Sequence, residues 1–205
     1  MDGVLVSSQG AVLRSWSRWA EHYGLDVEHT LKIMHGCRAL DTVKALRPNI
    51  DPAEGLALIE EIEMNDVEGI HALPGVKDLL RKLPTERWTI VTSAVERLAR
   101  QRLEAAGLNV PTRMVSAENV RKGKPDPEPY RKGAELLGVA PADCVVVEDA
   151  PAGVDAGRAA GSRVLGVVGT HTLMQLRHAE WRVNSLADVQ VETAQGGITM
   201  RFESI

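Results

Sequence analysis

The sequence predicts an open α/β fold: a Rossmann-like parallel sheet with helices on both faces, an inserted α-helical unit and a C-terminal β-hairpin. Three observations predict this fold class. Beyond residue 74, short apolar segments alternate with amphipathic helical patterns. Residues 13–73 carry helical patterns without a convincing strand. Near the end of the chain, Gly196-Gly197 separates two short segments of strand character.

The first elements are helical. Val12, Trp16 and Trp19 belong to an apolar set at helical spacing over residues 8–23, and Gly24 supplies a stop signal. Similar patterns predict helices over residues 27–34, 40–46 and 53–64. We therefore expect residues 13–73 to form a small all-helical unit.

The elements after Pro74-Gly75 alternate in type. The expected order is helix 76–83, strand 88–91, helix 96–106, strand 113–115, helix 127–137, strand 144–147, helix 152–160 and strand 163–168. Such spacing implies right-handed crossovers and a parallel sheet covered on both faces. A short strand over 181–184 and a hairpin around residues 189–202 complete the α/β unit, which we assign to residues 1–12 and 74–205.

Composition and charge exclude several classes of function. The 205 residues include 28 acidic and 24 basic side chains, a net charge of −4, so no basic field is available for nucleic acid or a membrane surface. Cys37 and Cys144 lie far apart and fit no metal-ligand spacing. The start of the sequence lacks a signal-peptide pattern, and no segment approaches a membrane span. We expect a cytoplasmic protein and take a monomer as the default.

Polar residues follow the apolar segments at four places. They are Asp2, Ser93, Lys124 and the pair Glu148-Asp149. In an open parallel sheet the ligand crevice lies beyond the carboxyl ends of the strands, so these side chains are the candidates for a shared site. Carboxylates, a hydroxyl and an ammonium group are what phosphoryl transfer requires: ligands for a magnesium ion, donors to phosphoryl oxygens and a carboxyl group that moves protons.

Each of these residues has a simpler structural interpretation. Ser93 and Glu96 match a capping box at a helix start, a role that is compatible with anion binding. Lys124 taken alone is typical of a solvated loop lysine. Asp149 could cap the next helix. The pair Glu148-Asp149 is harder to explain structurally, because two adjacent buried acids resist ionising together unless a positive partner compensates them.

Taken together, the order and spacing of these groups resemble the haloacid dehalogenase superfamily. Its signature is Asp-x-Asp-Gly at the first strand, then Ser or Thr, then a Lys-Pro segment, then an acidic pair. Residues 35–41, 123–130 and 147–153 are similar to the branch that contains β-phosphoglucomutase and the glycerol-phosphate and 2-deoxyglucose-6-phosphate phosphatases of yeast type. The resemblance covers nearly the whole chain and implies that residues 13–73 are a helical cap domain.

The resemblance implies a phosphatase mechanism that depends on Mg²⁺. The family's first aspartate attacks phosphorus and forms an aspartyl-phosphate. Asp2 matches the second aspartate, which protonates the leaving alkoxide, activates water, and offers its main-chain carbonyl to the metal. Asp149, with Glu148 acting directly or through water, completes the metal ligands. Ser93 and Lys124 hold phosphoryl oxygens.

The sequence departs from the family pattern at the nucleophile. That aspartate lies two positions before the residue matched by Asp2, and here only Met1 precedes Asp2. We expect a start assigned too late, or a fragment of a longer active enzyme, with the chain as printed inactive. A catalytically inactive relative that binds a metal or a metabolite is the alternative.

The expected cap suggests a small substrate. Arg38 lies where the cap of this family reaches toward the active site, and its planar fork suits a substrate hydroxyl or a second anionic group; an ion pair with Asp41 is an equal alternative. His35 and His171 are interpreted as structural. Sugar and polyol phosphates are the favoured substrates, and a phosphosugar mutase is the alternative activity.

Overall fold

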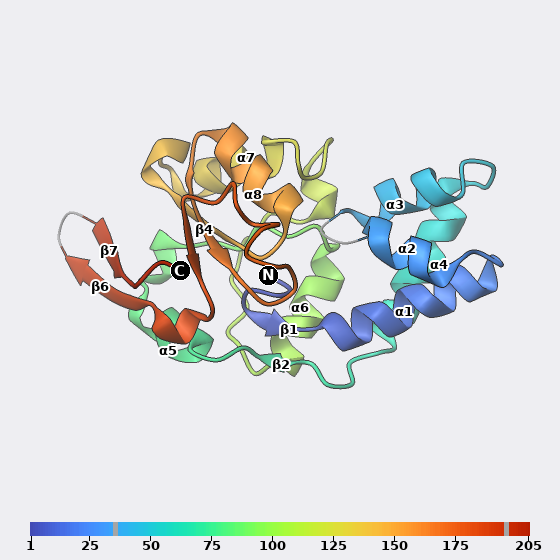
Figure 1. The fold of residues 1–205 in the computed structure, drawn as a ribbon, viewed down its shortest axis with the longest axis horizontal. Helices are drawn as coiled ribbons and strands as arrows, with labels where there is room; N and C mark the ends of the chain where they lie inside the picture. Colours follow the sequence, from blue (N-terminus) through green and yellow to red (C-terminus); the bar gives the residue numbers. More distant parts are fainter. Residues whose placement is uncertain (35–36, 195–196) are drawn as a thin grey trace.

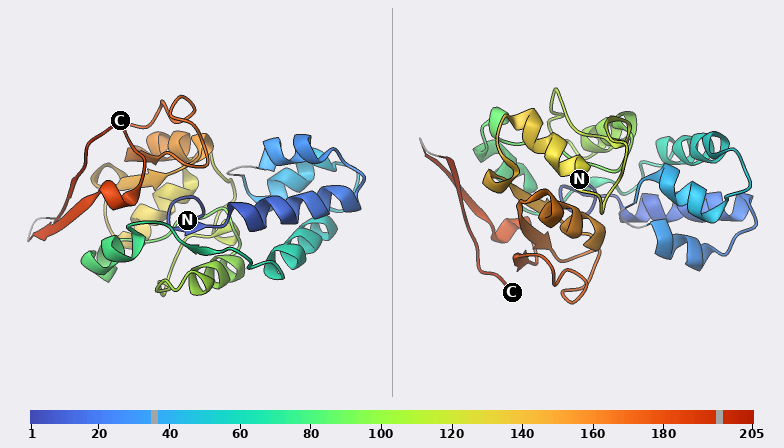
Figure 2. Two further views of the ribbon diagram at one scale, coloured as in Figure 1. Left: turned by 60° about the horizontal axis from the view of Figure 1, so that its bottom comes forward. Right: turned by 90° about the horizontal axis from the view of Figure 1, so that it is seen from above.

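The computed structural model describes residues 1–34, 37–194 and 197–205. Its elements fall into a helical unit on one side and an α/β unit on the other (Figure 1). The two further views in Figure 2 show the same separation, with the C-terminal hairpin on the far side of the α/β unit from the helical unit. His35, interpreted above as structural, lies outside the described residues.

The helical unit has its own core. It consists of α1 (Gln9–His22), α2 (Val27–Met34), α3 (Ala39–Leu46) and α4 (Pro52–Met64), each within two residues of the range that periodicity predicts. Trp16, Trp19 and Ile59 are buried in its centre. The two indole rings pack edge to face with centroids 5.3 Å apart, and Trp19 Nε1 donates to the Gly55 carbonyl at 2.9 Å. The tryptophans are therefore packing residues, as their spacing on the helix predicts.

The α/β unit is built on a parallel sheet in the order β3-β4-β5. Its strands are β3 (Val145–Glu148), β4 (Arg163–Val167) and β5 (Trp181–Val183). Helix α8 (Pro151–Ala160) connects β3 to β4 and packs on both of them, and α7 (Glu128–Leu137) packs against α8. This arrangement places the carboxyl end of β3, and with it Glu148, at the edge of the sheet where a ligand site is expected.

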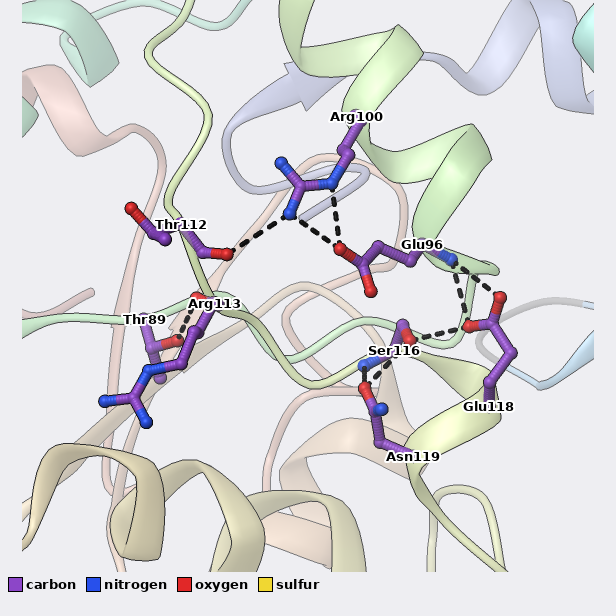
Figure 3. Close-up of polar contacts among 8 residues, drawn as sticks. All are labelled: Thr89, Glu96, Arg100, Thr112, Arg113, Ser116, Glu118 and Asn119. Carbon is purple, nitrogen blue, oxygen red and sulfur yellow. Dashed lines mark hydrogen bonds and ion pairs between the residues drawn. The ribbon is translucent and has the colours of Figure 1, made fainter.

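The two strands predicted over residues 88–91 and 113–115 are shorter than expected. Their only backbone pairing among the described residues is an isolated parallel bridge between Val91 and Val115. The neighbouring carbonyls accept from side chains: Arg100 donates to the Thr112 carbonyl at 3.3 Å and Thr89 to the Arg113 carbonyl at 3.4 Å (Figure 3). The extended segments thus remain parallel neighbours, with backbone pairing limited to this bridge among the described residues and with side chains bonded to two adjacent carbonyls.

The remaining elements frame the sheet. β1 (Val6–Ser7) pairs with β2 (His71–Ala72), a two-residue strand within the segment expected to lack strands. This pairing joins the chain as it enters and leaves the helical unit. Helices α5 (Val76–Lys82) and α6 (Glu96–Ala105) follow, and β6 (Gln190–Ala194) with β7 (Gly197–Arg201) forms the predicted antiparallel hairpin.

Candidate active site

Residues that the sequence singles out converge on one cavity of about 650 Å³. Its lining includes Asp2, Arg38, Ser93, Lys124, Glu148 and Asp149, together with apolar side chains of the helical unit such as Trp16 and Leu56. The volume is in the range that holds a small organic molecule. Convergence of groups from four separate chain segments follows from the parallel sheet, which brings its strand ends to a common edge.

Glu148 is the centre of a buried hydrogen-bond network. It is 4% exposed and Lys124 is 9% exposed. Its Oε1 accepts from Lys124 Nζ at 2.5 Å and from the Tyr130 hydroxyl at 2.6 Å. Its Oε2 accepts from the main-chain N–H groups of Asp149 and Ala150, both at 3.0 Å. Burial would raise the pKa of Glu148, but the Lys124 charge, the N-terminal ammonium of Met1 and the hydrogen bonds from Lys124 and Tyr130 lower it to about 2.

Asp149 is in the opposite electrostatic situation. Burial, followed by the negative charge of Glu148, raises its pKa to about 6. The Thr170 hydroxyl donates to Asp149 Oδ2, and His171 Nδ1 lies 3.0 Å from the Asp149 carbonyl oxygen. A Cβ added to Gly3, whose φ is +66°, would lie 2.0 Å from Asp149 Oδ2. The carboxylate therefore packs directly on the backbone next to Asp2.

Asp2 is held through one of its oxygens. Oδ1 accepts from the Ser8 hydroxyl at 2.5 Å and from Arg102 Nη1 at 3.1 Å. Burial raises the pKa of Asp2, but the Arg102 charge, the N-terminal ammonium of Met1 and the Ser8 hydrogen bond together outweigh it, and the net direction is downward. Arg102 is itself 3% exposed and also donates to Glu63 of α4 at 3.0 Å. The position of Arg102 within a helix did not predict its contact with Asp2, because an arginine in an amphipathic helix usually points to solvent.

The predicted capping box of Ser93 and Glu96 is not formed. Helix α6 has Val95 at its N-cap position, without a side-chain hydrogen bond. The Glu118 carboxylate, from a segment 22 residues away, accepts from the Glu96 N–H at 3.0 and 3.2 Å, and Ser116 supports it with a hydrogen bond of 2.6 Å (Figure 3). The capping carboxylate is thus supplied by tertiary contact, and Ser93 lines the cavity instead.

The geometry also decides between the alternative roles of Asp149 and of Arg38. Asp149 does not cap α8, whose N-cap is Ala150 without a side-chain bond; the free N–H groups before the helix bind Glu148. Arg38 forms the alternative ion pair with Asp41, through Nε at 2.7 Å and Nη2 at 2.9 Å. Its Nη1 donates to the Val120 carbonyl at 3.0 Å, which links the helical unit to the α/β unit.

The donor set limits how a metal could bind. Among the residues that the structure describes, no three His, Cys, Asp or Glu side chains gather as a metal cluster. Glu148 already accepts four hydrogen bonds, and the Asp2 carboxylate binds Ser8 and Arg102. Asp149 remains as a buried carboxylate of raised pKa, which a cation would compensate. Mg²⁺ keeps several waters and commonly uses one or two carboxylates, so the site fits this ion through Asp149.

Four polar residues of the site were not predicted to be functional from the sequence. Tyr130 lies within the 123–130 motif but was assigned no role, and Thr170 follows β4 as Asp149 follows β3. The rule that ligand sites lie beyond strand ends would have found Thr170. His171, interpreted as structural, lines the cavity beside Asp149. Arg102 carried no comparable signal.

Comparisons with known proteins agree with this architecture. A family model described as haloacid dehalogenase-like hydrolase matches residues 1–167. The chain is 42% identical to hexitol phosphatase A of Escherichia coli, covering 96% of this chain and 94% of that protein. It is 34% identical to glycerol-1-phosphate phosphohydrolase 2 of Saccharomyces cerevisiae, covering 84% of this chain and 74% of that protein.

Solved structures show the same fold. A hydrolase from Pseudomonas syringae superimposes with a TM-score of 0.81 at 25% identity, covering 91% of this chain and 92% of that chain. A β-phosphoglucomutase from Clostridium difficile gives a TM-score of 0.79 at 20% identity, covering 91% and 88%. No helix among the described residues is long and apolar enough to cross a membrane. The fold, the order of the site residues and the family match lead to one conclusion: the chain belongs to the haloacid dehalogenase-like hydrolase family.

Proposed function

We propose that the protein is a Mg²⁺-dependent phosphatase that hydrolyses small sugar or polyol monophosphates. The observation that carries the proposal is the single cavity lined by Asp2, Ser93, Lys124 and the pair Glu148-Asp149. The names of the related proteins, a hexitol phosphatase and a glycerol-1-phosphate phosphohydrolase, support the substrate class. In this proposal residues 13–73 act as a cap over a core of residues 1–12 and 74–205, in a cytoplasmic monomer.

Lys124 and Ser93 would bind the phosphoryl oxygens. Glu148 holds the Lys124 ammonium at 2.5 Å, so the charge that faces the cavity has a fixed position. Glu148 would thereby serve the metal indirectly, through water, and would not be a direct ligand. Asp149 and the main-chain carbonyl of Asp2 would hold Mg²⁺, which when bound neutralises charge on the phosphoryl group.

Asp2 would transfer the proton. The proposed reaction requires a nucleophilic carboxylate two positions before Asp2, a position that the printed sequence does not include. Asp2 gives its proton to the leaving alkoxide and then takes one from the attacking water. The Arg102 charge, which contributes to the lowered pKa of Asp2, favours the carboxylate form that takes a proton from water and opposes the protonated form that the first half of the cycle needs.

Hydrolysis is favoured over a mutase by the far end of the cavity. A mutase must also accept a sugar with phosphoryl groups at both ends, which requires a second anion site. Each of the three guanidinium nitrogens of Arg38 already has a partner in Asp41 or the Val120 carbonyl. Carboxylates of Glu60 and Glu118 also line the cavity. Arg97 also lines the cavity, but its guanidinium lies 3.8 Å from the Glu60 carboxylate, so its charge is already paired and the wall suits neutral hydroxyl groups better than a second phosphoryl group.

The test is product analysis with and without Mg²⁺. The printed chain, and the chain preceded by an apolar segment that places an aspartate two positions before Asp2, are incubated with hexitol, glycerol and glucose phosphates. We expect the extended chain to release inorganic phosphate only with Mg²⁺, and Lys124→Met to lose this activity. Isomerised sugar phosphate with little phosphate release would favour the mutase. Failure of both forms to act on any substrate, with metabolite binding retained, would favour the inactive relative.

A further inference from the structure

Arg102 connects the proposed proton donor to the helical unit. Its guanidinium lies between two carboxylates of different parts of the molecule, with Nη1 on Asp2 Oδ1 at 3.1 Å and Nη2 on Glu63 Oε1 at 3.0 Å. Asp2 precedes β1 of the α/β unit, whereas Glu63 lies on α4 of the helical unit. Because the donors are divided between two partners, the arginine acts as a bridge between them and does not form a bidentate pair with either.

The Arg102 guanidinium is buried, and burial restricts the positions that it can take. Arg102 is 3% exposed, and its Nε has no hydrogen-bond partner among the described residues. A buried guanidinium with an unmet donor is costly, and the two carboxylates are what compensate it. The arginine therefore has little freedom to leave Asp2 while Glu63 stays in place.

The contacts leave a specific oxygen of Asp2 available. Both Ser8 and Arg102 donate to Oδ1, and within the described part of the chain Oδ2 receives no side-chain donor. The carboxylate is thus oriented by one oxygen while the other is left for proton transfer. Glu63, Arg102 and Asp2 all line the cavity, so the bridge ends beside the proposed reacting atoms.

We propose that Arg102 is a positioning residue that orients the Asp2 carboxyl group for proton transfer and, through Glu63, makes that orientation depend on the seating of helix α4. The proposal rests on the phosphatase function stated above. In the step concerned, the bond between phosphorus and the leaving oxygen breaks, the phosphoryl group passes to the attacking carboxylate, and the proton of Asp2 moves to the alkoxide to give the free alcohol. Without the bridge, Asp2 rotates away from the leaving oxygen.

Two substrates with different leaving groups distinguish a positioning role of Arg102 from a purely structural one. An alkoxide such as that of a hexitol needs the proton of Asp2, whereas p-nitrophenolate leaves without one. The test variant is the double substitution R102M/E63M, which removes both charges and leaves no unpaired Glu63 behind. In the extended chain we expect kcat/KM for hexitol phosphate to fall about 100-fold and kcat/KM for p-nitrophenyl phosphate to fall less than about threefold, because kcat/KM reports the half of the reaction that releases the alcohol, whereas the later attack of water is common to both substrates. R102K, which reaches one carboxylate at a time, should restore part of the loss.

The same helix offers a matched control. Arg100 and Glu96 form an ion pair at 2.6 Å within α6, at 35% and 42% side-chain exposure, and do not line the cavity (Figure 3). R100M/E96M should change the two substrates by the same factor. An equal fall for both substrates in R102M/E63M would overturn the proposal, because it would indicate a structural role alone.

A second measurement does not depend on turnover. If the extended chain without substitutions hydrolyses neither substrate, the proposed function fails, but the bridge is still tested by a cycle of D2N, R102M and the double variant in urea unfolding. We expect an interaction between the two substitutions of about tenfold in the unfolding equilibrium constant, or about 1.4 kcal/mol in the free energy of unfolding. Additive effects of the two substitutions would show that Arg102 does not hold Asp2, and would also overturn the proposal.

Discussion

Glu148→Gln tests the buried network at the centre of the site. Each carboxylate oxygen of Glu148 accepts two hydrogen bonds, from Lys124 and Tyr130 on one side and from two main-chain N–H groups on the other. An amide has one oxygen and one NH₂ group. Whichever way the glutamine is turned, its NH₂ group faces two donors. The substitution preserves shape and removes both the charge and half of the acceptor capacity.

The expected loss follows from the pKa of Glu148. The folded protein lowers it from 4.5 to about 2, against the effect of burial, chiefly through the Lys124 charge. Each tenfold change in the acid constant corresponds to about 1.4 kcal/mol, so ionised Glu148 stabilises the folded state by about 3 kcal/mol at pH 7. This agrees with the cost of about 3–5 kcal/mol for removing one partner of a buried ion pair.

The sign of the pH dependence gives a second check. Because the pKa is depressed, the stabilisation is complete above about pH 4.5 and is lost as the pH falls through about 2. Urea unfolding should therefore show that the difference in free energy of unfolding between wild type and Glu148→Gln is about half as large at pH 3 as at pH 7. Glu128→Gln is the matched control: Glu128 also accepts two main-chain N–H groups and pairs with Lys132, but is partly exposed, so its loss should be much smaller. A loss below about 1 kcal/mol at pH 7, or equal losses at both pH values, would refute the reasoning.

Three other substitutions test the site and the helical unit. Gly3→Ala places a methyl group against Asp149 at a φ of +66°, so we expect about 2 kcal/mol lower stability and loss of the rise in Tm that we expect Mg²⁺ to give the unsubstituted chain; an unchanged response to Mg²⁺ would contradict the packing argument. Asp149→Asn removes an acid whose pKa is raised to about 6 by burial. In EDTA the free energy of unfolding of this variant should exceed that of the unsubstituted chain by up to about 3 kcal/mol, and the difference should develop between about pH 4 and 6. Mg²⁺ should not stabilise the variant further. Lower stability of this variant in EDTA at pH 8 would show that the carboxylate is not strained. Trp19→Ala empties the centre of the helical unit and breaks the bond to Gly55, and urea unfolding should show a loss of about 3–5 kcal/mol; a loss below about 1 kcal/mol would show that the unit does not depend on this core.

Local patterns predicted the elements well where the signal is local. Helices α1, α2 and α6 begin and end within about one residue of the predicted range, because apolar periodicity and a glycine stop are properties of neighbouring residues. The strand over residues 88–91 was overestimated for the opposite reason. Its length depends on whether residues 113–115 or side chains such as Arg100 take up the backbone groups, and the sequence near residue 88 does not contain that information.

The fold class and the candidate groups of the site can be predicted from the pattern of residues along the chain, since the carboxyl ends of parallel strands necessarily meet at one edge. The hydrogen-bond partner of each group depends on long-range contacts in the folded chain. Glu118, not Ser93, caps α6; Glu148, not Asp149, binds the N–H groups before α8; and Arg102, 100 residues from Asp2, orients that carboxylate. The Glu148 and Arg102 contacts depend on burial, because a buried charge must be satisfied by a nearby complementary group however distant that group is along the chain, whereas the exposed Glu118 contact depends on which segment the fold brings next to the start of α6.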